Sequence, residues 1–225
     1  VLERHSRRLE GLGHVLTVYE KNTDPKVQEE RCRDADVVML ANMPLALSAV
    51  EKAKNLKFID VAFTGVDHIP VEEAKRRGIA VSNASGYATQ AVAELCISFM
   101  IQLLRNVEET QRQCRGGGTK EGSLLWGKTV GIVGAGAIGR RVASLCKGFG
   151  CRVVAFNRSK VMDEAIDCQV SLEELLSQAD IVSLHCPLTE DTRGLIGSRE
   201  LGLMKRSAVL INTARGGVVD SRALS

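Results

Sequence analysis

The chain has no hydrophobic run that approaches the roughly 18 residues of a membrane-spanning helix. Its first residues do not show the pattern of a secretory signal peptide. Charge of one sign is also scarce, because 30 lysine and arginine residues are balanced by 27 aspartate and glutamate residues, for a net charge of +3. A surface built for nucleic acid carries a concentrated basic patch. We therefore expect no membrane partner and no nucleic-acid partner.

Paired cysteine motifs are absent too. No Cys-x-x-Cys pair occurs, and several cysteines lie within apolar helix or strand patterns. The seven positions are Cys32, Cys96, Cys114, Cys146, Cys151, Cys168 and Cys186. This distribution favours buried, reduced thiols, and no metal site is predicted. Because reduced thiols are typical of the cytosol, we expect a cytoplasmic protein.

The chain does contain enough apolar residues for a sizeable core, at 44% hydrophobic and 25% charged over 225 residues. Short apolar strands alternate with helices, which is the pattern of parallel sheets covered on both faces. A first α/β pattern has predicted strands at Val15–Tyr19, Val37–Ala41, Leu56–Phe63 and Ile79–Ser82, and helices at Pro25–Arg33, Leu45–Ala53 and Val71–Arg77. A second has helices at Gln90–Gln113, Ala137–Phe149, Leu172–Gln178 and Arg199–Met204, a loop at Gly116–Gly122, and strands at Thr129–Val133, Arg152–Phe156, Ile181–His185 and Ala208–Asn212.

The order of predicted elements indicates that the sequence is truncated at both ends. The chain opens with charged, helix-like residues, Leu2–Leu12, without the strand that begins a flavodoxin-like domain. It stops at Ser225, within a helix that is predicted to begin near Asp220. A doubly wound nucleotide-binding domain needs further strands after this point. We therefore expect both halves to be incomplete.

Residues 129–158 combine a strand, a glycine turn, a helix and a second strand, with the turn reading Gly134-x-Gly136-x-x-Gly139. In such a unit the first glycine permits the tight turn, and the second lets the backbone approach a pyrophosphate. The third lets the helix pack on the strand, and the helix N-terminus attracts the anion. This order predicts dinucleotide binding; the alternative is a purely structural glycine turn.

The residues after the second strand bear on the choice of dinucleotide. A carboxylate usually stands there and hydrogen-bonds the adenosine ribose hydroxyls, but here the position holds Asn157, followed by Arg158, Ser159 and Lys160. Asparagine does not repel a 2′-phosphate, and arginine and lysine supply charge-assisted donors worth about 1.5–3 kcal/mol each. We therefore predict that NADP(H) is favoured over NAD(H), with a solvated basic turn as the alternative interpretation.

Two further motifs end strands: His185-Cys-Pro-Leu-Thr-x-x-Thr192 and Asn212-Thr-Ala-Arg-Gly-Gly-x-Val-Asp220. With the glycine turn and the upstream segments 64–69, 81–87 and 91–94, the sequence resembles the D-isomer-specific 2-hydroxyacid dehydrogenases over nearly its whole length. That family includes glyoxylate/hydroxypyruvate reductases, phosphoglycerate dehydrogenases and D-lactate dehydrogenases. The resemblance implies two Rossmann-like, doubly wound parallel-sheet domains: a flavodoxin-like substrate domain over residues 1–95 and an NAD(P)-binding domain over residues 96–225.

The resemblance also assigns roles to single residues. It implies that Arg215 grips the carboxylate and carbonyl oxygen of a 2-keto acid, and that the loop at Thr64 and Gly65 receives the carboxylate. The alternative for Arg215 is a solvated loop arginine, and the alternative for Thr64 and Gly65 is an ordinary strand-to-helix turn. Tyr87 falls on a loop that can face substrate, with a core or hinge position as the alternative. On the cofactor side the resemblance places Gly134, Gly136, Ala137, Ile138, Gly139, Cys186, Pro187, Thr192, Thr213, Ala214 and Arg215. His185 also matches a cofactor-side position and is not predicted to be the proton donor.

Together these roles imply an oxidoreductase that transfers a hydride between NAD(P)H and a small 2-keto acid or D-2-hydroxy acid, and that forms a homodimer. Glyoxylate, hydroxypyruvate, pyruvate and bulkier keto acids share the carboxylate clamp, so the resemblance leaves the choice among them open. The family's catalytic glutamate and histidine fall beyond Ser225, and the chain as given is expected to be inactive by itself. The alternative function is that of the corepressor members, a catalytically silent, dinucleotide-sensing binding protein.

Overall fold

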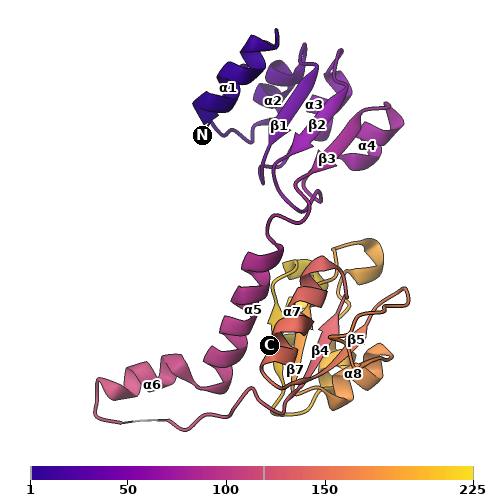
Figure 1. Cartoon of the computed structure of the whole chain (residues 1–225). Coiled ribbons are helices and arrows are strands. Elements are labelled where there is room, and N and C mark those ends of the chain that lie inside the picture. Colours follow the sequence, from indigo (N-terminus) through magenta and orange to yellow (C-terminus); the bar gives the residue numbers. More distant parts are fainter. Residues whose placement is uncertain (1, 119, 225) are drawn as a thin grey trace. The chain divides into compact units, whose positions relative to one another are not determined.

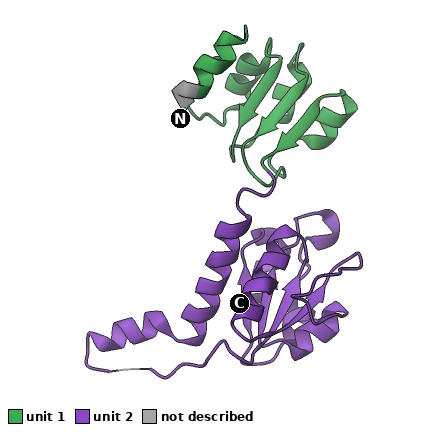
Figure 2. Ribbon diagram, in the orientation of Figure 1, with its two compact units in different colours: residues 1–84 green, residues 85–225 purple. Residues whose placement is uncertain are grey.

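A computed structural model describes residues 2–118 and 120–224. The chain divides into two compact units, Val1–Ala84 and Ser85–Ser225 (Figure 2). The boundary expected between residues 95 and 96 lies inside helix α5 (Thr89–Leu104), which belongs as a whole to the second unit. Both units are α/β with parallel sheets, as predicted.

The first unit is built on a three-stranded parallel sheet of order β1-β2-β3 (Figure 1). Its strands are β1 (Val37–Leu40), β2 (Phe58–Val61) and β3 (Ala80–Asn83), and its helices are α1 (Leu2–Gly11), α2 (Pro25–Cys32), α3 (Leu47–Lys52) and α4 (Val71–Arg76). Helix α2 begins where the sequence predicts, because Pro25 occupies its first turn and the Asp24 carboxylate accepts a hydrogen bond from Lys26 N (2.9 Å). Ile59, Val61 and Val50 are fully buried in the core of this unit.

The strand predicted at Val15–Tyr19 is wrong. This segment is neither helix nor strand and pairs with no strand among the described residues. Val15 is 96% exposed and Val18 63% exposed, so their apolar side chains cover no core. A strand is stabilised by its neighbour in a sheet, and an apolar, β-branched run alone does not supply one.

The second unit contains a five-stranded parallel sheet of order β6-β5-β4-β7-β8. The strands are β4 (Thr129–Val133), β5 (Arg152–Phe156), β6 (Cys168–Gln169), β7 (Ile181–Leu184) and β8 (Val209–Asn212). The chain crosses from β4 to β5 on one side and returns to β7 on the other side of β4. The order therefore reverses beside β4, and ligands of doubly wound sheets bind at such a reversal.

Helices cover both faces of this second sheet. Val153 and Ala155 pack with α5 and with α7 (Ala137–Gly148) in one core, whereas their neighbour Val154 packs with α8 (Leu172–Gln178) in another. This alternation follows the two-residue period of a strand. Helix α9 (Ser198–Leu203) and the 3-10 turns at Glu190–Thr192, Gly216–Val218 and Ser221–Leu224 also belong to this unit. The last of these turns stands where a helix was predicted to begin near Asp220.

The single long helix predicted from Gln90 to Gln113 is two helices in the structure, α5 and α6 (Val107–Cys114), which run in different directions (Figure 1). The break lies at Asn106, whose backbone is left-handed with φ +50°. Asparagine tolerates this conformation better than other residues with a side chain. The Asn106 amide donates to Glu121 O (2.8 Å), so the returning chain holds the break in place.

Two further expectations concern membranes and thiols. Among the described residues, no helix is long and apolar enough to cross a membrane. The cysteines are free thiols, and all but Cys114 and Cys168 are buried. Burial of most of the thiols is therefore confirmed.

Candidate functional site

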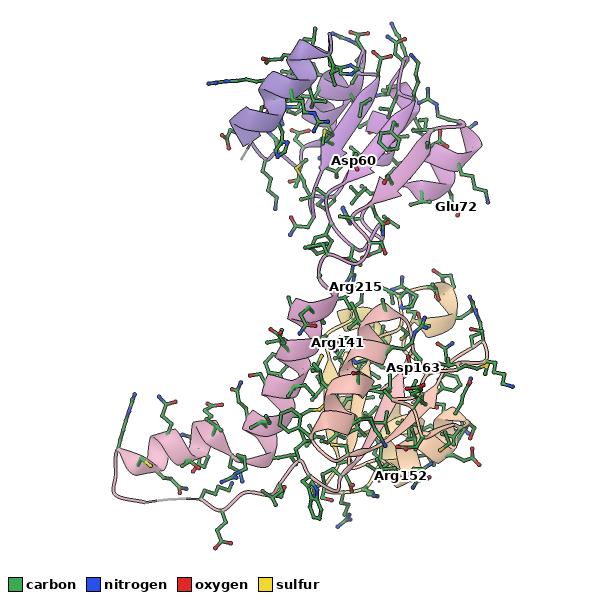
Figure 3. The ribbon with its side chains drawn as sticks, viewed as in Figure 1. Asp60, Glu72, Arg141, Arg152, Asp163 and Arg215 are labelled. Carbon is green, nitrogen blue, oxygen red and sulfur yellow. The ribbon has the colours of Figure 1, made fainter. Side chains whose placement is uncertain are left out.

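Four loops that carry predicted site residues follow strands of the second sheet. Gly134 follows β4, Asn157 follows β5, His185 follows β7 and Thr213 follows β8. Because these strands are parallel neighbours, their carboxyl ends lie along the same edge of the sheet. Figure 3 shows Arg215 at one end of this unit and Arg152, which starts β5, at the opposite end.

The space around each of the three glycines of the turn explains differently why glycine stands there. Gly134 has φ +95°, and a Cβ there would lie 2.7 Å from Cys186 N. A Cβ at Gly139 would overlap the Gly134 carbonyl oxygen. A Cβ at Gly136 would meet nothing within 4 Å. Packing therefore explains Gly134 and Gly139, whereas Gly136 leaves open space at the start of α7.

This open space suits a pyrophosphate. Gly136 is the N-cap residue of α7 and provides no side-chain acceptor for the first N–H groups of the helix, which include those of Ala137 and Ile138. Uncapped N–H groups and the positive end of the helix dipole attract an anion. A side chain at position 136 would fill the space that the anion needs. The residues present therefore fit the phosphates of a dinucleotide.

Hydrogen bonds from neighbouring strand ends hold the glycine turn. Gly134 N donates to Phe156 O (2.9 Å), and Ala135 N donates to the side-chain oxygen of Asn157 (3.1 Å). The Asn157 amide nitrogen donates in turn to Ser159 O (3.0 Å) and Ser159 Oγ (3.1 Å). Asn157 thus joins the glycine turn to the basic loop that follows β5. The sequence shows that Asn157 stands where a carboxylate is usual. It does not indicate the hydrogen bond to Ala135, because the two residues are 22 positions apart.

The basic loop itself faces solvent. Arg158, Ser159 and Lys160 are exposed, and in the described part of the chain neither basic side chain forms an ion pair. Both positive charges therefore remain uncompensated by a neighbouring carboxylate, as a phosphate-binding position requires.

The loop after β7 is folded on itself. The Thr192 hydroxyl donates to Pro187 O (2.6 Å) and accepts from Thr189 N (2.8 Å). Cys186 is buried against the glycine turn, and burial raises the pKa of its thiol. The structure therefore brings Cys186 beside Gly134, while Thr192 shapes the loop through bonds within it.

His185 stands just before this loop and is bound within the unit. Its Nε2 lies 2.9 Å from Ser183 Oγ, and burial lowers the pKa of the imidazole to about 4. A histidine with this pKa is neutral near pH 7 and does not act as an imidazolium donor. This agrees with the expectation that His185 is not the proton donor.

The side chain of Asn212, a residue to which the motif assigns no role of its own, holds the loop after β8. Its side-chain oxygen accepts from Ala214 N (3.1 Å), and its amide nitrogen donates to Arg215 O (2.8 Å). The half-buried Arg215 guanidinium donates to Ala214 O (2.9 Å). Thr213 Oγ1 lies 3.2 Å from the buried thiol of Cys96 on α5. Ala214 and Arg215 are thus held in a defined backbone conformation at the edge of the sheet.

The remaining predicted residues are on other segments of the chain. Thr64 and Gly65 follow β2 of the first unit, where the Asn83 amide donates to Thr64 O (2.6 Å). Thr64 Oγ1 is a buried hydroxyl without a hydrogen-bond partner in the described residues. Tyr87 belongs to the second unit and is 61% exposed, so the alternative of a core tyrosine is wrong.

Comparison with known proteins identifies the family. Residues 97–225 match the model of the NAD-binding domain of D-isomer specific 2-hydroxyacid dehydrogenases. The chain belongs to this family. A glyoxylate reductase of Thermococcus litoralis is 38% identical over 221 residues, which cover 89% of this chain and 67% of that protein. A glycerate dehydrogenase of Methylorubrum extorquens is 36% identical over 221 residues, 94% of this chain and 69% of that protein.

Solved structures of this family and its relatives share the fold. A D-lactate dehydrogenase from Aquifex aeolicus, complexed with NAD and lactic acid, superposes with a TM-score of 0.89 at 30% identity over 99% of this chain and 69% of that one. An acyclic imino acid reductase in complex with NADPH and D-Arg gives a TM-score of 0.91 at 31% identity, covering 98% and 73%. The family is one of oxidoreductases, and the second unit is a nicotinamide-dinucleotide-binding domain.

Proposed function

We propose that this protein is an oxidoreductase that transfers a hydride between NADP(H) and a small 2-keto acid or D-2-hydroxy acid. The observation that carries the proposal is the glycine turn, where Gly136 leaves open space beside uncapped N–H groups at the reversal of strand order. The first unit, Val1–Ala84, is then the substrate domain and the second unit, Ser85–Ser225, the NAD(P)-binding domain. When bound, the reduced nicotinamide supplies the hydride.

Different residues of the second unit bind different parts of the cofactor. The turn from Gly134 to Gly139 and the N–H groups of Ala137 and Ile138 receive the pyrophosphate. Asn157, Arg158, Ser159 and Lys160 receive the adenosine ribose and its 2′-phosphate. Cys186, Pro187 and Thr192 flank the adenosine side, and the backbone of Thr213 and Ala214 supports the nicotinamide.

Arg215 is the proposed catalytic residue of this chain. Its guanidinium is always charged and presents paired donors that match a carboxylate and an adjacent carbonyl oxygen. Asn212 fixes its backbone, so the side chain leaves the sheet edge from a constant position. By donating to the carbonyl oxygen, Arg215 stabilises the negative charge that develops as the hydride arrives at carbon.

In the first unit, we assign substrate binding to Thr64 and Gly65. The unpartnered hydroxyl of Thr64 supports this assignment, because a buried hydroxyl without a partner costs about 1–3 kcal/mol and a carboxylate oxygen would satisfy it. Tyr87 is proposed to contribute to the substrate side as well, since its ring is exposed rather than packed in a core.

The preference for NADP(H) rests on the exposed charges of Arg158 and Lys160, which form no ion pair with any described residue, and on the absence of a carboxylate at position 157. We also propose a homodimer. Helix α5 exposes Leu95, Phe99 and Leu103, which are four residues apart and therefore lie on one face of the helix. An exposed apolar stripe of this kind is typical of a protein contact surface. A cytoplasmic location is proposed on the free thiols in the cores.

The catalytically silent alternative has no observation in its favour, and the relatives named above are enzymes by name. The proposed function is tested with purified full-length protein, NADPH, and glyoxylate, hydroxypyruvate or pyruvate in turn. We expect oxidation of NADPH, followed by its absorbance, with at least one keto acid. The Arg215→Ala variant should lose this activity, while Arg199→Ala, a change of an exposed side chain on α9, should keep it. No oxidation with any of these acids, by either reduced cofactor, would contradict the proposal.

A further inference from the structure

One side chain holds the basic loop that follows β5, and it comes from the edge of the sheet. Gln169, on the two-residue strand β6, donates from Nε2 to Asn157 O (2.9 Å) and to Ser159 O (3.0 Å). Its Oε1 accepts from Val161 N (2.9 Å). Both ends of a single amide therefore bind the backbone of residues 157–161.

The chemistry of glutamine matches this position. An amide offers two donors on nitrogen and acceptor sites on oxygen. The two carbonyl groups of Asn157 and Ser159 need the nitrogen, and the N–H of Val161 needs the oxygen, so the partners fix the orientation of the amide. Glutamate lacks the donors, and methionine and leucine lack both functions.

The position of Gln169 is itself set by the sheet. Its backbone is opposite Ala155 in the β5–β6 ladder, and Val170 N donates to Ala155 O (2.9 Å), which places the side chain beside the end of β5. The far end of the loop is anchored separately, because Val161 packs against the core that lies under α5 and α7.

Ser159 O is the point at which two anchors meet. It accepts from Gln169 Nε2 and from Asn157 Nδ2, and Asn157 in turn accepts from Ala135 N in the glycine turn. The backbone that carries Arg158 and Lys160 is therefore tied both to the edge strand and to the pyrophosphate turn.

We propose that Gln169 is a positioning residue for the 2′-phosphate: it holds the loop so that Arg158, Ser159 and Lys160 are ready to bind this group. This inference rests on the proposed preference for NADP(H). Without the three hydrogen bonds, the loop has more conformations in the free protein, and binding the 2′-phosphate must then restrict them. NADH has no 2′-phosphate and meets this loop only through its ribose, so it gains much less from an ordered loop.

The test compares Gln169→Ala and Gln169→Glu with the wild type by fluorescence titration of NADPH and NADH. We expect Gln169→Ala to weaken NADPH binding roughly three- to tenfold, as for the loss of one or two net hydrogen bonds, with NADH binding almost unchanged. Gln169→Glu should lose at least as much, because it cannot donate to the two carbonyls and brings a negative charge near the phosphate. Gln178→Ala, at the end of α8, is the matched control and should alter neither affinity.

A double-mutant cycle separates positioning from a general loss of structure. If Gln169 acts through the loop that presents Arg158, then Gln169→Ala should have little further effect on NADPH affinity once Arg158 is replaced by alanine. Equal weakening of NADPH and NADH, or full additivity with Arg158→Ala, would overturn the inference while leaving the cofactor preference intact. A wild type that binds both reduced cofactors equally would overturn the preference and the inference together.

Discussion

Gly136 offers a prediction in which binding and folding respond differently to one methyl group. A Cβ added there meets nothing within 4 Å, and the backbone has φ −75°, which alanine adopts without strain. Gly136→Ala should therefore keep the fold, with a loss of unfolding free energy of no more than about 1 kcal/mol from the weaker N-cap. The same methyl group occupies the space in which the pyrophosphate is proposed to approach the start of α7.

We expect Gly136→Ala to weaken the binding of NADPH and of NADH alike, by at least roughly tenfold, or about 1.4 kcal/mol. Both cofactors share the pyrophosphate, so the change should not alter the preference between them. Gly139→Ala is the contrasting variant, because its Cβ overlaps the Gly134 carbonyl oxygen. Overpacking of this kind costs about 1–3 kcal/mol of unfolding free energy.

The assay pairs urea unfolding with fluorescence titration of each reduced cofactor for the two variants and the wild type. Gly136→Ala should keep its unfolding free energy within about 1 kcal/mol of the wild type and lose affinity, whereas Gly139→Ala should lose more stability and also affinity. Wild-type affinity for both cofactors in a folded Gly136→Ala protein would refute the placement of the pyrophosphate.

Further variants test the basic loop, Arg215, the buried His185 and the exposed face of α5. Arg158→Ala should weaken NADPH binding by about 1.5–3 kcal/mol and leave NADH binding nearly unchanged, and this difference should shrink at high salt. Titration of both cofactors at two salt concentrations tests this expectation. An unchanged NADPH affinity would count against Arg158 as a ligand of the 2′-phosphate. Arg215→Lys should lower kcat/KM for the keto acid roughly a hundredfold or more, since a lysine does not reproduce the paired donors; wild-type kinetics would remove Arg215 from the site. The pKa of His185 is lowered from 6.5 to about 4 in the folded protein. As the pH falls, this histidine is therefore protonated in the unfolded chain before it is protonated in the folded one. Stability should therefore decrease between about pH 6.5 and pH 4 by up to roughly 1.4 kcal/mol per pH unit, and His185→Asn should remove that part of the slope in unfolding titrations. Phe99→Arg on α5 should convert a dimer to monomers in analytical ultracentrifugation, whereas Val15→Arg in the first unit should not; a monomeric wild type contradicts the proposed assembly.

The parts of the fold that local sequence determines were predicted well. The strands and helix of residues 129–156 match because β-branched runs, a glycine turn and helical spacing are short-range patterns. The break at Asn106 was missed because neither glycine nor proline marks it, and the contact with Glu121 that supports it arises only in the folded chain. Strand β6 is not predicted from the sequence, because its two residues are too few to show the two-residue alternation of a strand.

The candidate site shows the same division. The motifs predict Gly134, Gly136 and Arg215 as site residues without any knowledge of the fold. The hydrogen bonds of Asn157 to the glycine turn, and of Gln169 to the basic loop, join residues that are distant in sequence and adjacent only through the order of the sheet strands. Polar contacts of this kind depend on tertiary structure and leave no periodic signal.

The central claim is that this family member reduces a 2-keto acid with NADPH in preference to NADH. The most direct measurement is kcat/KM for each reduced cofactor, with the full-length protein at a saturating concentration of its best keto acid. We expect a value for NADPH at least roughly tenfold higher than for NADH, as one or two charge-assisted contacts to the 2′-phosphate would give. An equal or higher value for NADH would contradict it.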